Sequence, residues 1–259
     1  MRRPKTAKAV KPNVGIRVWY RKQIEKLIGR MKASVLRWVP AAYRKGANAK
    51  ALDKAIENLR EYWTGTFEES GIKIAERLVK RIDSTSRNAI KRAFSEVGFN
   101  IDWSRDKTVN NVLDSLRRTQ VDLIKTIPSS QLDSVTGIVQ RGIQMGRDLA
   151  SIQEELTNGF DITYKRARMI AIDQSQKATH AINRARYLQA GVKEAVWVHV
   201  AGKHTSRKTH VAMHGKRFKL EGEDAGLYDS AVGHNVMPAE LVNCRCSCRA
   251  VIPDNFFDV

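Results

Sequence analysis

The chain of 259 residues lacks any run of about 18 apolar side chains, the length that a helix needs to span a bilayer. Its first fifteen residues, MRRPKTAKAVKPNVG, are basic but hold no apolar stretch of the kind found in secretory signals. A Walker loop, a dinucleotide-binding fingerprint and a Ser/His/Asp triad pattern are also missing. We therefore expect neither a membrane span nor an export signal, and no common enzyme motif points to a reaction.

Cysteine is scarce, and its three copies are crowded into five residues, at Cys244, Cys246 and Cys248. An odd number at this spacing does not suit a disulfide framework. The sequence therefore predicts a protein made in a reducing cytoplasm.

Acidic residues are nearly absent from the first fifty positions. Fifteen Lys or Arg stand there against the single acid Glu25, whereas the other 209 residues carry 31 basic and 26 acidic side chains. Charge concentrated in this way indicates a polyanionic partner, either a nucleic acid or an acidic protein or lipid surface. A solvated basic tail is the alternative, and composition does not separate the two.

Helical spacing of apolar residues dominates the chain up to about residue 191. We expect a basic flexible arm over residues 1–15, an N-terminal helical region over 16–128 and central helices over 129–191. Pro40 and Pro128 are expected to end helices, and Ser129 or Ser130 to begin the next one. Further breaks are expected at residues 83–86 and 158–163.

The pattern changes after Gly191. Alternating residues predict short strands at 196–200, 217–220 and 244–252, with a long polar loop over 222–238. The predicted fold is mainly α, a multi-helix body with a small C-terminal α/β cap of a few short strands over residues 192–259.

Two blocks in this cap carry most of its chemistry: RKTHVAMHGK from Arg207 to Lys216, and PAELVNCRCSC from Pro238 to Cys248. Thiolate and imidazole are ligands that zinc prefers, so zinc is a possible cofactor, although we expect no cofactor. The candidate ligands are His210, His214, Cys244 and Cys246.

The spacing of the cysteines speaks partly against a metal. On a strand, Cys244 and Cys246 would sit about 6.6 Å apart, whereas two sulfurs on one zinc approach to roughly 3.8 Å. The other interpretation is structural: small buried cysteines, a hydrogen-bonded His210, and loops fixed by side-chain bonds of Asn243 and Arg245.

Two catalytic interpretations also remain open. A nuclease of the His-Asn-His kind would need a helix after His234-Asn235, and no helical pattern follows these residues. A cysteine nucleophile with His210 as base would need one thiol of lowered pKa, which a sequence does not reveal.

The order of motifs resembles the phage Mu F-like head morphogenesis, or minor head protein, family over about residues 130–250. The resemblance lies in a long helix ending in Ala190-Gly191-Val192, the strand Val196-Trp197-Val198, the pattern R-x-x-H-x-x-M-x-G from Arg207, and the pattern P-x-E-x-x-N-C-R-C from Pro238. Two features depart from the family: residues 172–176 read IDQSQ where an Arg-Thr-Glu-like signature is common, and Cys248 is additional.

The resemblance implies a minor head protein of a tailed bacteriophage, not an enzyme. It implies a virion protein of the head interior or portal vertex, present in the host cytoplasm during assembly, with the portal protein, the major capsid protein and packaged double-stranded DNA as partners. The residues expected to hold the cap together are Arg207, His210, Met213, Gly215, Pro238, Glu240, Asn243, Cys244, Arg245 and Cys246. The alternative is an enzymatic effector carried in the virion, such as a metal-dependent nuclease.

Basic residues near the N-terminus are expected to contact DNA phosphates or an acidic partner without reading base sequence. They are Arg2, Arg3, Lys5, Lys8, Lys11, Arg17, Arg21 and Lys22. Trp19, Tyr20 and Trp38 lie at helical spacing, which is more typical of core residues than of side chains that stack on bases.

Overall fold

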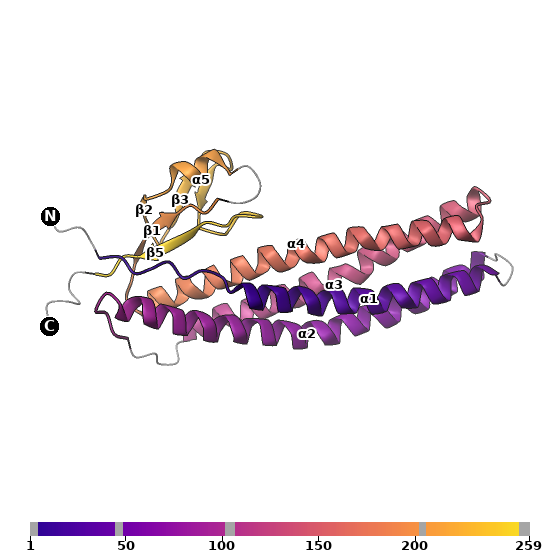
Figure 1. Ribbon diagram of the computed structural model, residues 1–259, viewed down its shortest axis with the longest axis horizontal. Helices are drawn as coiled ribbons and strands as arrows, with labels where there is room; N and C mark the ends of the chain where they lie inside the picture. The colour runs from indigo at the N-terminus through magenta and orange to yellow at the C-terminus, as the bar shows by residue number, and fades with distance from the viewer. Residues whose placement is uncertain (1–4, 45–48, 102–106, 202–205, 254–259) are drawn as a thin grey trace. The chain divides into compact units, whose positions relative to one another are not determined.

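The computed structural model describes residues 5–44, 49–101, 107–201 and 206–253. Four long helices come first, α1 (Val14–Arg44), α2 (Ala49–Ser95), α3 (Lys107–Gln144) and α4 (Leu149–Gln189). A small cap follows, with β1 (Glu194–Val198), α5 (Lys208–Ala212), β2 (Arg217–Lys219), β3 (Leu227–Asp229), β4 (His234–Val236) and β5 (Ser247–Ala250) (Figure 1). The predicted fold class, mainly α with a small cap of short strands, is confirmed. Within the described residues, no helix is both long and apolar enough to cross a membrane.

The chain forms two compact units that do not follow the order of the sequence. The first unit contains the segment up to residue 17, residues 78–116 and residues 172–259. The second contains residues 18–77 and 117–171. Each long helix therefore contributes to both units, with a boundary inside the helix rather than at a loop.

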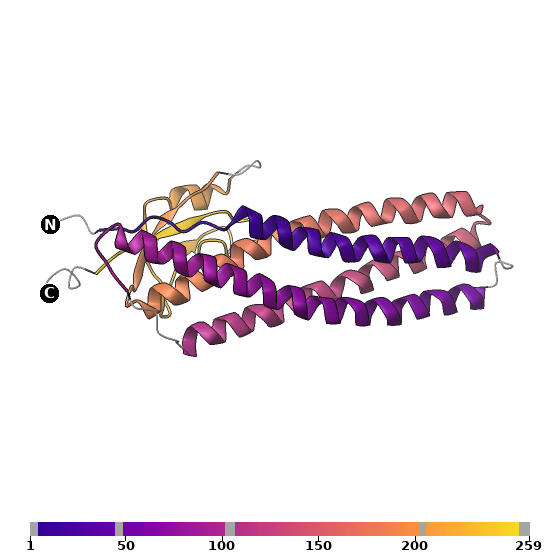
Figure 2. The same cartoon turned by 60° about the horizontal axis from the view of Figure 1, so that its bottom comes forward.

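The second unit consists of four helical segments that lie side by side (Figure 2). Its core includes an apolar stripe at helical spacing along α1, in which Tyr20, Ile24, Met31 and Val35 are fully buried. The Tyr20 hydroxyl donates a buried hydrogen bond of 2.8 Å to the Gln120 side chain of α3. The stripe ends before Trp38, which is 52% exposed.

Helices α1 and α3 both continue through a proline, so the breaks predicted at Pro40 and Pro128 are wrong. A proline inside a helix removes one backbone hydrogen bond and costs about 3 kcal/mol. Around Pro128 the helix is held by side chains packed in the core, with Ile124 and Ile127 almost completely buried. Tertiary burial thus outweighs the local preference.

The breaks predicted in α2 and α4 are also wrong, because each helix is continuous. In α2, Asp83 does not disrupt the helix but pairs with Arg186 of α4, whose Nε lies 3.0 Å from Oδ1. In α4, Phe160 follows Gly159 and is fully buried. Polar or small residues that suggest a break in isolation are here used for contacts between helices.

The cap contains a three-stranded antiparallel sheet in the order β2-β1-β5. Trp197 of β1 lies opposite Cys248 of β5 and is fully buried. A second pair, β3 and β4, forms a hairpin inside the segment that was predicted to be a loop. Gly226 enters this hairpin with φ of +90°, and a Cβ there would lie 2.5 Å from the Val236 carbonyl oxygen, so only glycine fits.

The N-terminal segment is held against the cap over residues that were expected to form a flexible arm. Thr6 bridges to Val251, the Ala7 amide donates to the Ala250 carbonyl at 3.0 Å, and Ala7 is buried. The side chain of Asn183 in α4 donates to the Val10 carbonyl at 3.1 Å. Residues 5–7 therefore extend the edge of the sheet beside β5 (Figure 1).

His180 of α4 should make stability depend on pH. Burial lowers its pKa to about 4, whereas the unfolded chain has a value near 6.5. Between these values the unfolded state binds more protons, so the free energy of unfolding should fall by up to about 3 kcal/mol as the pH drops from 7 to 4.

Chemical denaturation at pH 7 and pH 4.5 measures this effect, with His180→Gln as the comparison because it removes the titrating group and keeps a polar helix former. The variant should lose distinctly less stability than the original chain over this interval. The same loss in both proteins would show that His180 is not the responsible group.

Candidate functional site

The structure brings the two motif blocks of the cap into contact. Arg207, at the start of the first block, donates from Nη2 to the Val242 carbonyl of the second block at 3.0 Å. His210 Nδ1 lies 3.4 Å from Cys244 Sγ and 3.7 Å from Cys246 Sγ. These three side chains are all buried, and their ligand atoms lie within 4.8 Å of one another.

His210 is held in a fixed orientation by a buried carboxylate. Its Nε2 lies 3.1 Å from Oδ2 of Asp229, the last residue of β3, and Asp229 Oδ1 accepts the Ala231 amide at 2.9 Å. Burial alone would raise the pKa of Asp229, but hydrogen bonds, with the Ala231 amide foremost, hold it below its ordinary value. In the tautomer that donates from Nε2 to this carboxylate, the Nδ1 lone pair faces the two sulfurs.

Trp197 closes the other side of the His210 ring. The two rings meet edge to face with centroids 5.3 Å apart, and Phe218 of β2 packs on the indole in turn. Trp197 and Phe218 belong to the apolar core of this unit, which therefore packs against the histidine.

Cys244 and Cys246 precede β5, which begins only at Ser247, so the prediction of a strand from residue 244 is wrong. The chain turns at Asn243, whose φ of 61° lies in the left-handed region that asparagine tolerates well. The separation of about 6.6 Å expected on a regular strand therefore does not apply, and both sulfurs reach the same histidine nitrogen.

The two thiols differ in acidity. A hydrogen bond from the Cys244 thiol is the main cause that lowers the pKa of Cys246 to about 7, helped by the Val200 amide. The pKa of Cys244 is raised by the same interaction and by burial. Cys246 is thus the more acidic of the two thiols.

His199, which follows β1, lies at the edge of this cluster. Its Nδ1 is 3.6 Å from Cys246 Sγ. His214, a ligand candidate from the sequence, has another contact: its Nδ1 accepts the His199 backbone amide at 3.1 Å. The structure therefore places His199 beside the cluster in the position that the sequence suggested for His214.

Cys248 lies on β5, where burial raises its pKa to about 12. It is not one of the three residues whose ligand atoms converge. This cysteine behaves as a small core residue, as the structural interpretation of the sequence expected for all three.

Other residues of the two motif blocks shape the backbone around the cluster. Gly215 has φ of +81° and donates its amide to the Trp197 carbonyl at 2.9 Å. The Glu240 carboxylate accepts the Met237 amide at 2.7 Å and so closes the turn that contains the buried Pro238. Met213 is buried in the cap core.

Two residues of α4 hold the cysteine loop by its backbone. Asp173 Oδ1 accepts the Asn243 amide at 2.9 Å, and Gln176 Nε2 donates to the Arg245 carbonyl at 3.3 Å. Asn243 and Arg245 thus contribute backbone groups to these bonds, rather than the side-chain bonds expected from the sequence. Sequence reasoning missed Asp173 and Gln176, although their helix segment was noted as a departure from the family.

The basic residues predicted to bind a polyanion are mostly at the surface. Lys5, Lys8, Lys11 and Lys22 are exposed, and Arg17 is partly buried. Lys8 pairs with Glu96 at 2.9 Å and Arg21 with Glu25 at 3.5 Å, so part of this charge is compensated. Arg2 and Arg3 lie outside the described residues. Of the three aromatic residues, Tyr20 is core, Trp19 lies under the Arg77 guanidinium and Trp38 is exposed.

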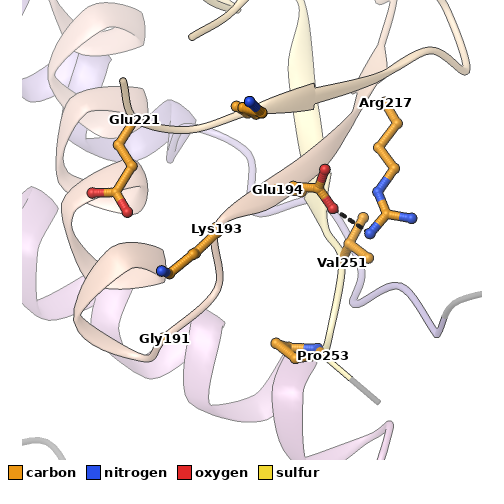
Figure 3. Close-up of a pocket in the computed structure, with 8 residues that line it drawn as sticks. Gly191, Lys193, Glu194, Arg217, Glu221, Val251 and Pro253 are labelled. Carbon is orange, nitrogen blue, oxygen red and sulfur yellow. Dashed lines mark ion pairs between the residues drawn. The ribbon is translucent and has the colours of Figure 1, made fainter. Parts of the chain in front are cut away.

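A surface pocket of about 610 Å³ lies beside β1 and β2, at the start of the cap. Its charged lining residues are Lys193, Glu194, Arg217, Lys219 and Glu221, and an ion pair joins Glu194 to Arg217 (Figure 3). Histidine and cysteine are absent from the described residues that line it. These lining residues therefore supply no thiolate or imidazole ligand for a soft metal.

Comparison with known proteins agrees with the motif order. Residues 133–249 match the family model described as Phage Mu protein F like protein. The chain is 25% identical, over 269 residues, to an uncharacterized protein of Haemophilus influenzae, an alignment that covers 98% of this chain and 57% of that protein. This chain thus spans little more than half the length of that relative, and no solved structure matches it. The family match runs from α3 through both motif blocks into β5, and it confirms that residues 133–249 form a phage Mu F-like region.

Proposed function

We propose that this chain is a minor head protein of a tailed bacteriophage, associated with the portal or the inner capsid wall and acting in head assembly and in DNA packaging or delivery. The observation that carries the proposal is the family match over residues 133–249, which includes both motif blocks and suggests a phage head morphogenesis protein. The motif residues of these blocks hold one another in place, which supports a shared structural purpose.

A structural role fits the His/Cys cluster better than catalysis does. His210, Cys244 and Cys246 are each at most 5% exposed. A nuclease needs an open metal position that a phosphate can reach, whereas enclosed sites with several protein ligands are typical of structural metals. The alternative of a virion-carried metal-dependent nuclease therefore gains no support from this cluster.

The charge of the first fifty residues supports a polyanionic partner in the head. Fifteen basic residues and one acid fall there, and Lys5, Lys11 and Lys22 have exposed side chains. Packaged double-stranded DNA is the partner that we propose, through phosphate contacts that carry no base specificity. The portal protein and the major capsid protein are the proposed protein partners, and the proposed location is the head interior or portal vertex, reached from the host cytoplasm during assembly.

The triple substitution Lys5→Gln, Lys11→Gln and Lys22→Gln should weaken duplex DNA binding by the purified chain. Each lysine that no longer neutralises a phosphate should make the dependence of log affinity on log salt less steep by about 0.9, so by up to about 2.7 for all three. Fluorescence anisotropy with labelled duplex DNA across a salt series measures this slope.

A matched control removes three exposed lysines from the charge-balanced part of the chain: Lys73→Gln, Lys80→Gln and Lys165→Gln. Its salt slope should stay close to that of the original protein. If both triple variants show equal slopes, the N-terminal charge has no particular role in DNA binding, and if the original chain shows no binding at low salt, DNA is not its partner.

Particles assembled by the phage or prophage that encodes the chain should contain it in few copies. Quantitative mass spectrometry of purified heads, with the major capsid protein as internal reference, measures the ratio. We expect the copy number of this chain to be a small fraction of that of the major capsid protein. The ratio should not change when the tails are removed. Absence from purified heads, with the chain present in the lysate, would contradict a virion role.

A further inference from the structure

We propose that His210, Cys244 and Cys246, with His199 as the fourth ligand, form a structural zinc site that holds the C-terminal cap together. The site is independent of the proposed function, because it concerns how the cap is held together and not what the cap binds. It joins three parts of the cap that are separate in sequence: the residue after β1, the short helix α5 and the loop before β5.

Three separations of sulfur from nitrogen fit the edges of a tetrahedral zinc site. Zinc bonds of about 2.3 Å to sulfur and about 2.05 Å to nitrogen at tetrahedral angles set sulfur and nitrogen about 3.6 Å apart. The separations of sulfur from nitrogen are 3.4 Å for Cys244 and His210, 3.7 Å for Cys246 and His210, and 3.6 Å for Cys246 and His199. All three lie within about 0.2 Å of the expected edge.

Hydrogen bonds alone explain this arrangement less well. His210 Nδ1 has one lone pair and can accept from one thiol, yet two sulfurs converge on it. Cys246 in turn faces a nitrogen of a second imidazole. Several electron-pair donors directed at one small volume are what a cation requires, and the pairing of soft thiolates with imidazole selects zinc over Mg²⁺ or Ca²⁺.

The groups around the donors are those that support a metal site. The buried Asp229 carboxylate holds Nε2 of His210 at 3.1 Å, which is the carboxylate–histidine arrangement that orients metal-binding imidazoles. Backbone amides of Ala239 and Cys246 direct hydrogen bonds at the Cys244 sulfur. Asp173 and Gln176 fix the loop on either side of Cys244 through the backbone of Asn243 and Arg245.

His199 supplies the fourth ligand from the rim of the site. It is partly exposed, and its Nδ1 lies 3.6 Å from Cys246 Sγ. It is not among the three residues whose ligand atoms lie within 4.8 Å of one another, so its side chain would have to move toward them to complete the coordination. With four protein ligands the metal position is closed, which is typical of structural rather than catalytic zinc.

Metal analysis of the full chain, expressed without a histidine tag and purified without chelator, tests the proposal. We expect about one equivalent of zinc per chain. Replacement by Co²⁺ should give the intense visible bands of a tetrahedral ion and a thiolate charge-transfer band in the near ultraviolet. These spectra need no variant and so decide the question even if substitutions unfold the cap. Less than about a tenth of an equivalent of zinc, together with no such Co²⁺ spectrum, would overturn the proposal.

Variants identify the ligands. Cys246→Ser should lose the charge-transfer intensity of one thiolate and bind Zn²⁺ at least tenfold more weakly in a chelator competition, while Cys248→Ala, the matched cysteine outside the cluster, should keep full binding. His199→Ala should also weaken binding at least tenfold, compared with His234→Ala, an exposed histidine of the same cap. Equal zinc affinity in Cys246→Ser and Cys248→Ala would contradict the proposed zinc site. Unchanged zinc affinity in His199→Ala would show that His199 is not the fourth ligand.

Discussion

The cap depends on one buried histidine that is held between a carboxylate and two sulfurs. Asp229 fixes the Nε2 side of His210, and Cys244 and Cys246 converge on Nδ1. Burying an aspartate is costly unless it is paired, so this carboxylate specifies where the imidazole must lie. The edge of the ring then contacts Trp197, so the polar contacts and the apolar core share one side chain.

Several local structures are too small to be stable without these contacts. Helix α5 has five residues, far fewer than an isolated helix needs in water, and β3 and β4 have three residues each. His210 lies on α5 and Asp229 at the end of β3, so their bond joins two weak elements to each other. Arg207 and Asp173 join the cysteine loop to α5 and to α4. The proposed zinc would act at the point where these elements meet.

How far the sequence predicts this structure depends on the range of the interactions involved. Helical spacing correctly indicated a mainly α protein, because the stripe that includes Tyr20 and Ile24 is a local pattern. Pro128 and Asp83 suggested breaks, because both residues are unfavourable inside a helix. The helix at Pro128 is stabilised by the burial of neighbouring Ile124 against other segments, and Asp83 is paired with Arg186 of α4. Such partners are invisible in a window of a few residues.

The candidate site shows the same division. The motif blocks indicated that His210, Cys244 and Cys246 belong together, and in the structure their ligand atoms lie within 4.8 Å of one another. The objection that a Cys-x-Cys pair is too widely spaced assumed a strand, whereas the left-handed turn at Asn243 delays β5 to Ser247. His199 and Asp229 lie in neither block, and only the pairing of β1 with its neighbours and the β3–β4 hairpin bring them to the cluster.

The start of the basic N-terminal region is bound to the cap by backbone hydrogen bonds, and this affects how it could bind DNA. The Ala7 amide bonds to Ala250 of β5, the Ile252 amide bonds to Lys5, and Lys8 pairs with Glu96. Residues 5–7 thus line the edge of the sheet in the same unit that holds the His/Cys cluster. A phosphate bound at Lys5 would therefore be held at a fixed position relative to β5. A protein that binds DNA on such an edge loses less conformational entropy than one with a free basic tail, because the backbone is already ordered before the partner arrives.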